Sequence, residues 1–150
     1  MECLLETRNT TESHTPFAPA ILRYIDAFGS KFTEGRSVAS FVQDTLGFRV
    51  NLPEPVLAEM ASDAEAKPLL QLVIPLKSGQ QMNVVLAEGV VAGERVVIMD
   101  LSVLHETAIQ PNVGDVMASF DAAHDAIHRV FVGVTKKLFP IMEPIDGEDK

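Results

Sequence analysis

The C-terminal segment 115–142 constrains the fold of this chain more than any other stretch. Apolar residues recur in it at steps of three and four, the spacing that places side chains on one face of an α-helix. They are Val116, Phe120, Ala123, Ile127, Val130, Val134, Leu138 and Ile141. Asp121, Asp125 and Arg129 fall on the opposite side. Because so long an apolar stripe is unstable in water, the pattern predicts an amphipathic helix that covers a sheet or another chain.

Charges and prolines at the two ends of this segment agree with a helix. Asp115 lies in the expected first turn, and Lys136 and Lys137 lie near the last. This order complements the helix dipole, which favours acidic groups at the start and basic groups at the end. Pro140 and Pro144 mark the expected end of the helix.

Three strands are predicted before the helix. They cover Leu69 to Lys77, Gln81 to Ala87 and Arg95 to Leu104. Ser78-Gly79 is a turn signal between the first two, and Gly89 and Gly93 bound a looser connection before the third. Because the intervals are short, an antiparallel meander is favoured over parallel crossovers.

The first part of the chain adds one strand and one helix. Ala20 to Phe28 is apolar on both faces and predicts a strand. Ser37 to Leu46 has helical spacing with Gly47 placed to end it, and Val56 to Met60 suits one or two helical turns. The predicted order is β-α-β-β-β-α, an α+β fold with an antiparallel sheet covered by one long C-terminal helix. Whether the first strand pairs beside the meander or at its far edge stays open.

A chain of 150 residues suits one domain that buries roughly 70% of its unfolded surface. We expect a single α+β domain over residues 19–142. The polar residues 1–18 lack any period and predict a mobile lead-in, and the acidic residues 143–150 predict a solvated tail.

The charge balance limits the partners of the protein. Twelve Lys and Arg against 21 Asp and Glu give a formal net charge of −9. So acidic a chain repels phosphate backbones, which argues against nucleic acid as a partner. No apolar run is long enough for a membrane span. Cys3 is the only cysteine, and no signal-peptide pattern opens the chain. A cytoplasmic protein is expected.

Several short motifs resemble an uncharacterised, sporadically distributed prokaryotic protein family. They are Val97-Ile98-Met99-Asp100-Leu101-Ser102, Phe120-Asp121-Ala122-Ala123-His124-Asp125-Ala126-Ile127-His128-Arg129-Val130-Phe131, Thr135-Lys136-Lys137-Leu138 and Arg23-Tyr24-Ile25-Asp26. Asp26 stands where the family pattern has Asn. The resemblance covers residues 20–142 and implies one continuous α+β unit. It implies no activity, so no catalytic role is carried over.

His124 and His128 stand four residues apart, a spacing that projects both rings from one side of a helix. With Asp121 and Asp125 nearby they could hold a divalent transition metal, and His14, His105 and Glu106 are further ligand candidates. A site needs a complete ligand set, whereas rings that flank an apolar stripe commonly pack against a sheet. The structural interpretation is favoured, and neither a metal nor a cofactor is expected.

Asp100 lies in the apolar third strand of the meander, where a carboxylate must be hydrogen-bonded, paired or solvated. It could be a general base with a raised pKa. The favoured interpretation is a capping or ion-pairing aspartate, with Arg23 on the first strand as a candidate partner. Arg23 and Tyr24 could line a pocket for an anionic ligand. Side chains of an ordinary sheet surface explain these two residues equally well.

Other motifs carry no chemistry. Gly89 to Gly93 lacks the ending of a phosphate loop, and His105-Glu106 resembles a zinc-protease motif whose second histidine is replaced by Ile109. Cys3 lies in the predicted mobile end. The serines have no base partner that is visible in the sequence. No catalytic residue is therefore assigned.

The sequence favours a non-enzymatic protein-interaction or binding module, with a chaperone-like role as one form of it. We expect a homo-oligomer or a protein partner. A different class, a small-molecule or metal-dependent enzyme, would use Asp100, His124 and His128. A third alternative is an antitoxin or immunity protein that binds a basic partner, which the acidic charge suggests.

Overall fold

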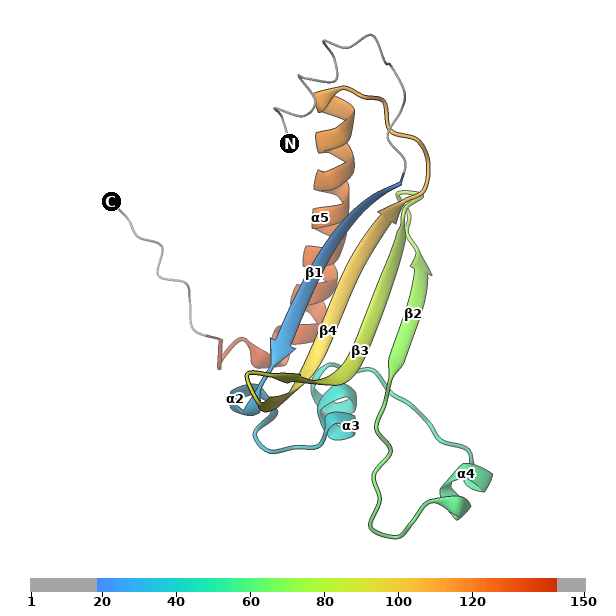
Figure 1. Cartoon of the computed structure of the whole chain (residues 1–150), viewed down its shortest axis with the longest axis vertical. Helices are drawn as coiled ribbons and strands as arrows, with labels where there is room; N and C mark the ends of the chain where they lie inside the picture. Colours follow the sequence, from blue (N-terminus) through green and yellow to red (C-terminus); the bar gives the residue numbers. More distant parts are fainter. Residues whose placement is uncertain (1–18, 143–150) are drawn as a thin grey trace, which may run out of the picture. The chain divides into compact units, whose positions relative to one another are not determined.

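The computed structural model describes residues 19–142 of the chain (Figure 1). Its strands are β1 (Ala20–Phe28), β2 (Leu70–Pro75), β3 (Gln81–Val91) and β4 (Glu94–His105). They form an antiparallel sheet in the order β1-β4-β3-β2, and the long helix α5 (Val113–Thr135) follows them. The predicted α+β fold is confirmed. The open question about the first strand is also answered, because β1 pairs with β4, at the far edge of the meander.

The other helices are short. They are α2 (Ser30–Thr33), α3 (Val38–Ser40), a π-helix (Phe41–Thr45), α4 (Glu54–Glu59) and a 3-10 helix (Lys136–Leu138). Of these, α2 is absent from the predicted elements.

The helix predicted over Ser37 to Leu46 is present but widens after its first turn. The Ser37 side chain accepts a hydrogen bond from the Ser40 backbone N–H at 3.1 Å and caps the start of α3. The Leu46 N–H then reaches back five residues to the Phe41 carbonyl at 3.1 Å, the spacing of a π-helix. Gly47 has a φ of +82°, so the residue predicted to end the helix adopts the left-handed conformation that glycine tolerates.

The connection between β3 and β4 is tighter than the predicted loop from Gly89 to Gly93. Strand β3 continues through Gly89 to Val91, and the turn uses only Ala92 and Gly93, both with positive φ. A Cβ atom on Gly89 would lie 2.3 Å from Ile98 Cδ1. Gly89 is therefore a site of close approach between neighbouring strands, and it does not end the strand.

Helix α5 is shorter at its C-terminal end than the predicted span 115–142. Asn112 Oδ1 accepts the Asp115 backbone N–H at 2.9 Å and caps the start. The α-helix ends at Thr135, and the chain continues as the 3-10 helix. Pro140 has no N–H, so an α-helical hydrogen-bond ladder could not continue regularly through the rest of the predicted span.

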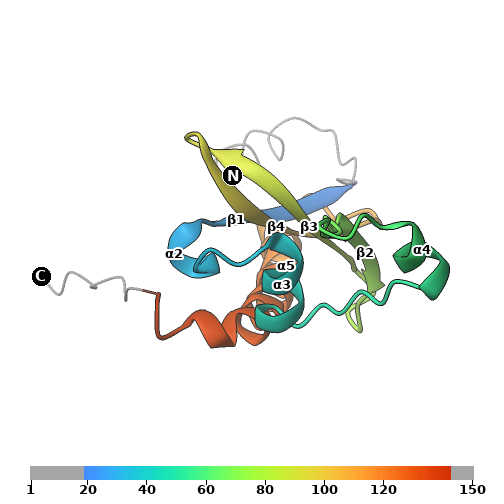
Figure 2. The same ribbon diagram turned by 90° about the horizontal axis from the view of Figure 1, so that it is seen from below.

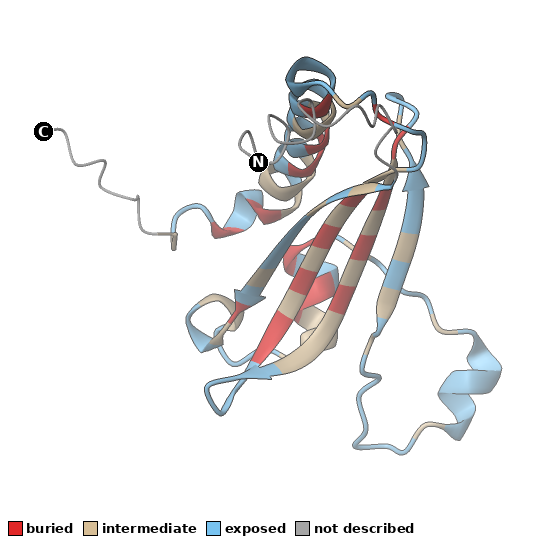
Figure 3. Ribbon diagram, turned by 45° about the horizontal axis from the view of Figure 1, so that its top comes forward, coloured by how far each residue is buried: buried red, intermediate tan, exposed pale blue. Residues whose placement is uncertain are grey.

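The chain divides into two compact units. Unit 1 contains residues 19–25, Gln71–Val85 and Asp100–Val130. Its core joins α5 to the inward side chains of β3 and β4, and every second residue of these strands is buried (Figure 3). The buried side chains are Met82, Val84, Leu101, Val103, Ile109, Val116, Ala123, Ala126 and Ile127. The apolar stripe of α5 thus covers one face of the sheet in this unit.

Unit 2 contains Asp26–Leu70, Leu86–Met99 and residues 131–142. Phe28 forms its aromatic centre, with ring centroids 5.6 Å from Phe41 and 5.8 Å from Phe32. Helices α2 and α3 lie on the same side of the β3–β4 hairpin (Figure 2). Helix α4 is exposed along its whole length.

The prediction of one domain over residues 19–142 stays a prediction. The predicted lead-in 1–18 and tail 143–150 lie outside the described residues. Within the described part of the chain, no helix combines the length and apolarity that a bilayer crossing requires.

Candidate functional site

Arg23 and Asp100 form a bidentate ion pair across β1 and β4 in unit 1. Arg23 Nε lies 2.9 Å from Asp100 Oδ1, and Arg23 Nη2 lies 2.5 Å from Oδ2. The hydrogen bond and charge of Asp100 raise the pKa of Arg23 above its ordinary value. The predicted ion pair is thus confirmed, and Asp100 is occupied by it.

Tyr24 and the two helix histidines form a second group in unit 1. The Tyr24 hydroxyl lies 3.0 Å from His124 Nδ1, and the His124 and His128 rings stack with centroids 6.0 Å apart. Both histidines are exposed. Among residues 19–142, no three His, Cys, Asp or Glu side chains gather closely enough to hold a metal ion, and the candidate ligand His14 lies outside that range.

These two groups lie on opposite faces of the sheet, because successive side chains of a strand point to opposite faces. Tyr24 points toward α5, where it meets His124, and Arg23 points away from α5, where it meets Asp100. The five residues singled out from the sequence therefore form two separate groups. The enzyme alternative places Asp100, His124 and His128 in one site, whereas Asp100 lies on the opposite face of the sheet from the two histidines.

The sheet face that carries Arg23 and Asp100 is the open face of unit 1. Ile21 and Ile25 of β1 are each 57% exposed, and Val73 of β2 is 56% exposed. The pairing of Arg23 with Asp100 leaves no net charge between the two isoleucines along β1. The open face therefore combines exposed aliphatic side chains with a neutral ion pair.

A cavity of about 380 Å³ in unit 1 contains a serine–histidine pair that the sequence analysis missed. Ser119 Oγ lies 3.2 Å from His105 Nδ1, and Thr107 Oγ1 lies 2.7 Å from His105 Nε2. The serine sits in α5 and the histidine ends β4, so sequence spacing carries no signal of their meeting. The sequence shows no base partner for any serine, and the structure places His105 beside Ser119.

The surroundings of the Ser119–His105 pair are those of a helix interior. The backbone N–H groups around Ser119 are used within α5, so they are not free to bind an oxyanion. The Ser119 carbonyl accepts a hydrogen bond from the buried Gln80 side chain at 3.2 Å. The arrangement fixes the helix against the sheet of unit 1.

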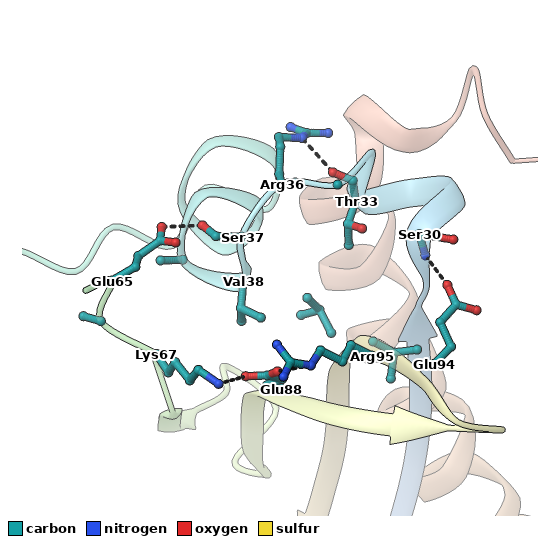
Figure 4. A pocket seen from close by; sticks show the side chains of 15 residues that line it. Ser30, Thr33, Arg36, Ser37, Val38, Glu65, Lys67, Glu88, Glu94 and Arg95 are labelled. Atoms are coloured by element: carbon teal, nitrogen blue, oxygen red, sulfur yellow. Dashed lines mark hydrogen bonds and ion pairs between the residues drawn. The ribbon is translucent and has the colours of Figure 1, made fainter. Parts of the chain in front are cut away.

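A second cavity of about 420 Å³ lies wholly in unit 2 (Figure 4). Its lining includes residues 30–39 around α2 and α3, residues 65–67 before β2, and residues of the β3–β4 hairpin. Six charged side chains surround it, namely Arg36, Glu65, Lys67, Glu88, Glu94 and Arg95. The predictions from sequence named none of these residues, because three distant segments contribute them.

Glu88 is the centre of the charged side of this cavity. Its carboxylate lies 3.0 Å from Lys67 Nζ and 3.6 Å from Arg95 Nε. The hydrogen bond from Lys67, with the charges of Lys67 and Arg95, lowers the pKa of Glu88. The carboxylate of Glu94 accepts the Ser30 backbone N–H at 2.7 Å, and hydrogen bonding at Ser30 lowers the pKa of Glu94.

The comparisons of this chain with known proteins were negative. No protein-family model, curated protein or solved structure matches the chain. The resemblance to an uncharacterised prokaryotic family therefore stays a prediction.

Proposed function

We propose that this protein is a binding module that associates with a second copy of itself through the open face of unit 1. The observation that carries the proposal is the exposure of Ile21, Ile25 and Val73 on that one face. Aliphatic side chains exposed on a sheet surface lower the free energy of the system when a partner removes them from water.

The charge of the open face favours a second copy over a basic partner. The chain carries a net charge of −9, so most of its surface repels another copy. On the open face, Arg23 and Asp100 neutralise each other. In a symmetric interface, the patch on one copy contacts the same patch on the other copy. A locally neutral patch permits this contact, whereas a charged patch would repel its equivalent.

The same neutrality weakens the antitoxin or immunity alternative. A basic toxin would be attracted to an acidic surface, and the open face offers an ion pair with aliphatic neighbours instead. The enzyme alternative has less support, since Asp100 and the two histidines lie on different faces of the sheet.

Sedimentation velocity at micromolar concentration tests the proposal. We expect the wild-type chain to sediment as a dimer and the double variant Ile21→Gln, Ile25→Gln to sediment as a monomer. Glutamine removes the aliphatic contact and leaves the net charge unchanged. Thermal denaturation of the variant confirms that loss of the dimer does not come from unfolding.

The matched control is Val56→Gln, Leu57→Gln on α4, whose side chains are exposed to a similar degree. We expect this control to remain a dimer. A wild-type chain that is monomeric at micromolar concentration contradicts the proposal. A dimer that the control disrupts and the open-face variant does not would place the interface on α4.

A further inference from the structure

The cavity of unit 2 presents opposite charges close together on one short segment. Glu65 and Lys67 stand two residues apart before β2, and both line the cavity. Figure 4 shows Lys67 reaching Glu88 at the base of the cavity, with Glu65 beside Ser37 on one side. A ligand that lies against this segment meets an ammonium group and a carboxylate at neighbouring positions.

The basic side chains keep hydrogen-bonding capacity for a ligand. Lys67 and Arg95 share the single carboxylate of Glu88, so this part of the cavity has one positive charge in excess. Lys67 is 68% exposed and Arg95 is 80% exposed, and the Arg95 contact uses Nε at 3.6 Å. Lys67 and Arg95 therefore keep N–H donors that can bind an added carboxylate while both side chains stay near Glu88.

Arg36 does not contribute in the same way. Its Nε donates to the Thr33 carbonyl at 3.1 Å and its Nη1 donates to Thr45 Oγ1 at 2.7 Å. Its guanidinium also lies 5.8 Å from the centre of the Phe41 ring. Arg36 therefore holds the wall of the cavity together.

A carboxylate with spare acceptor capacity completes the polar lining. Glu65 accepts a hydrogen bond from the Ser37 hydroxyl. A carboxylate has about four lone-pair sites, so Glu65 can accept further hydrogen bonds from a ligand ammonium group. The lining also has an apolar part that includes Val38, Val96 and Val97, of which the last two are buried.

From this arrangement we propose that the cavity binds a free amino acid with an aliphatic side chain. Its α-carboxylate pairs with Lys67 and Arg95, its α-ammonium group pairs with Glu65, and its side chain packs on Val38. The two charges of an amino acid are attached to one carbon, and Glu65 and Lys67 present a carboxylate and an ammonium group two residues apart in the cavity lining. The three cationic and three anionic side chains of the lining balance, so a zwitterion binds without adding net charge.

The inference does not depend on self-association, because the cavity and the open face use different residues. The test is a titration of the ¹⁵N-labelled full chain with L-leucine, followed by backbone amide shifts. N-acetyl-L-leucine, which lacks the ammonium group, and L-leucinamide, which lacks the carboxylate, are the matched probes. We expect L-leucine to give saturable shifts at residues lining the cavity. Each probe should bind about tenfold more weakly or worse, because each loses one charge-assisted contact.

Variants of the protein test separately how the carboxylate and the ammonium group of the ligand contribute to binding. We expect Lys67→Gln and Glu65→Gln each to weaken L-leucine binding about tenfold or more, because each removes one charge-assisted contact. Glu59→Gln on α4, outside the cavity lining, should bind as the wild type does. Both cavity residues are exposed, so thermal denaturation should show that these variants remain folded.

Three results would overturn the inference. The first is an absence of saturable shifts with L-leucine at millimolar concentration. The second is equal binding of L-leucine and both probes, which means that the charges do not contribute. The third is equally tight binding of N-acetyl-L-leucine and L-leucine. That result would mean that the cavity binds a carboxylate without recognising the ammonium group.

Discussion

At the scale of single residues, the sheet imposes different environments on neighbouring side chains of one strand. Arg23 and Tyr24 are adjacent in β1, yet one pairs with Asp100 on the open face and the other contacts His124 of α5. The alternation of a strand makes this inevitable once the register is set. The sequence suggested the Arg23–Asp100 pair, but it carried no signal for the contact between Ser119 and His105.

Asp26 is the residue whose charge we expect to destabilise the fold. It lies partly buried in β1, and this burial raises its pKa above the ordinary value. The raised pKa means that the folded state prefers the protonated form. The contribution of Asp26 to stability is therefore complete below the ordinary pKa of an aspartate and is lost as the pH rises through the raised folded-state pKa.

Asp26→Asn should therefore raise the melting temperature at pH 7, with a smaller gain at acidic pH, where the wild-type carboxyl is protonated in both states. Thermal denaturation at the two pH values measures the difference. Asp63→Asn, at an exposed position in unit 2, is the control and should change little. An equal gain at both pH values would show that charge is not the cause.

At the scale of elements, the long helix depends on the cap that starts it as well as on its apolar stripe. The Asn112 side chain accepts the Asp115 N–H at 2.9 Å and donates to the Asp115 carboxylate at 2.8 Å. The first backbone N–H groups of a helix have no hydrogen-bond acceptor within the helix. A capping side chain provides an acceptor for one of them, which would otherwise bond to water. The sequence shows the apolar stripe, but the predicted helix start at residue 115 is two residues later than the observed start at Val113.

Asn112→Ala should lower the free energy of unfolding by about 1 kcal/mol, the usual effect of removing a helix cap. Asn112→Ser is the matched control, because a serine hydroxyl accepts the same N–H without placing a second carboxylate beside Asp115. Chemical denaturation of both variants measures the change. The role of Asn112 as a cap is refuted if Asn112→Ser loses as much stability as Asn112→Ala.

At the scale of the whole molecule, the net charge of −9 acts against the proposed self-association. Two copies repel each other over distances comparable with the Debye length, and salt shortens that length from about 10 Å at 0.1 M to about 3 Å at 1 M. The open face contributes little to this repulsion because its ion pair is neutral. Self-association should therefore strengthen as salt is added.

We expect the dimer dissociation constant to fall several-fold between low and high sodium chloride concentrations. Sedimentation equilibrium over a salt series measures this fall. Ion pairs between the copies would give the opposite trend, because salt weakens attractive surface charges. A dimer that weakens with salt would thus contradict an interface held mainly by aliphatic contacts.

The sequence by itself determined the fold class, because period and turn signals are local properties of the chain. The repeat of three and four in α5, the β-branched third strand of the meander and its short turns together specified an antiparallel sheet with a covering helix. Only the tertiary structure decided that β1 pairs with β4, that β3 runs through Gly89, and that Ser119 meets His105. It also assembled the cavity around Glu88 from three distant segments. The physical reason is that strand pairing and side-chain convergence depend on packing between residues far apart in the chain, which local patterning does not record.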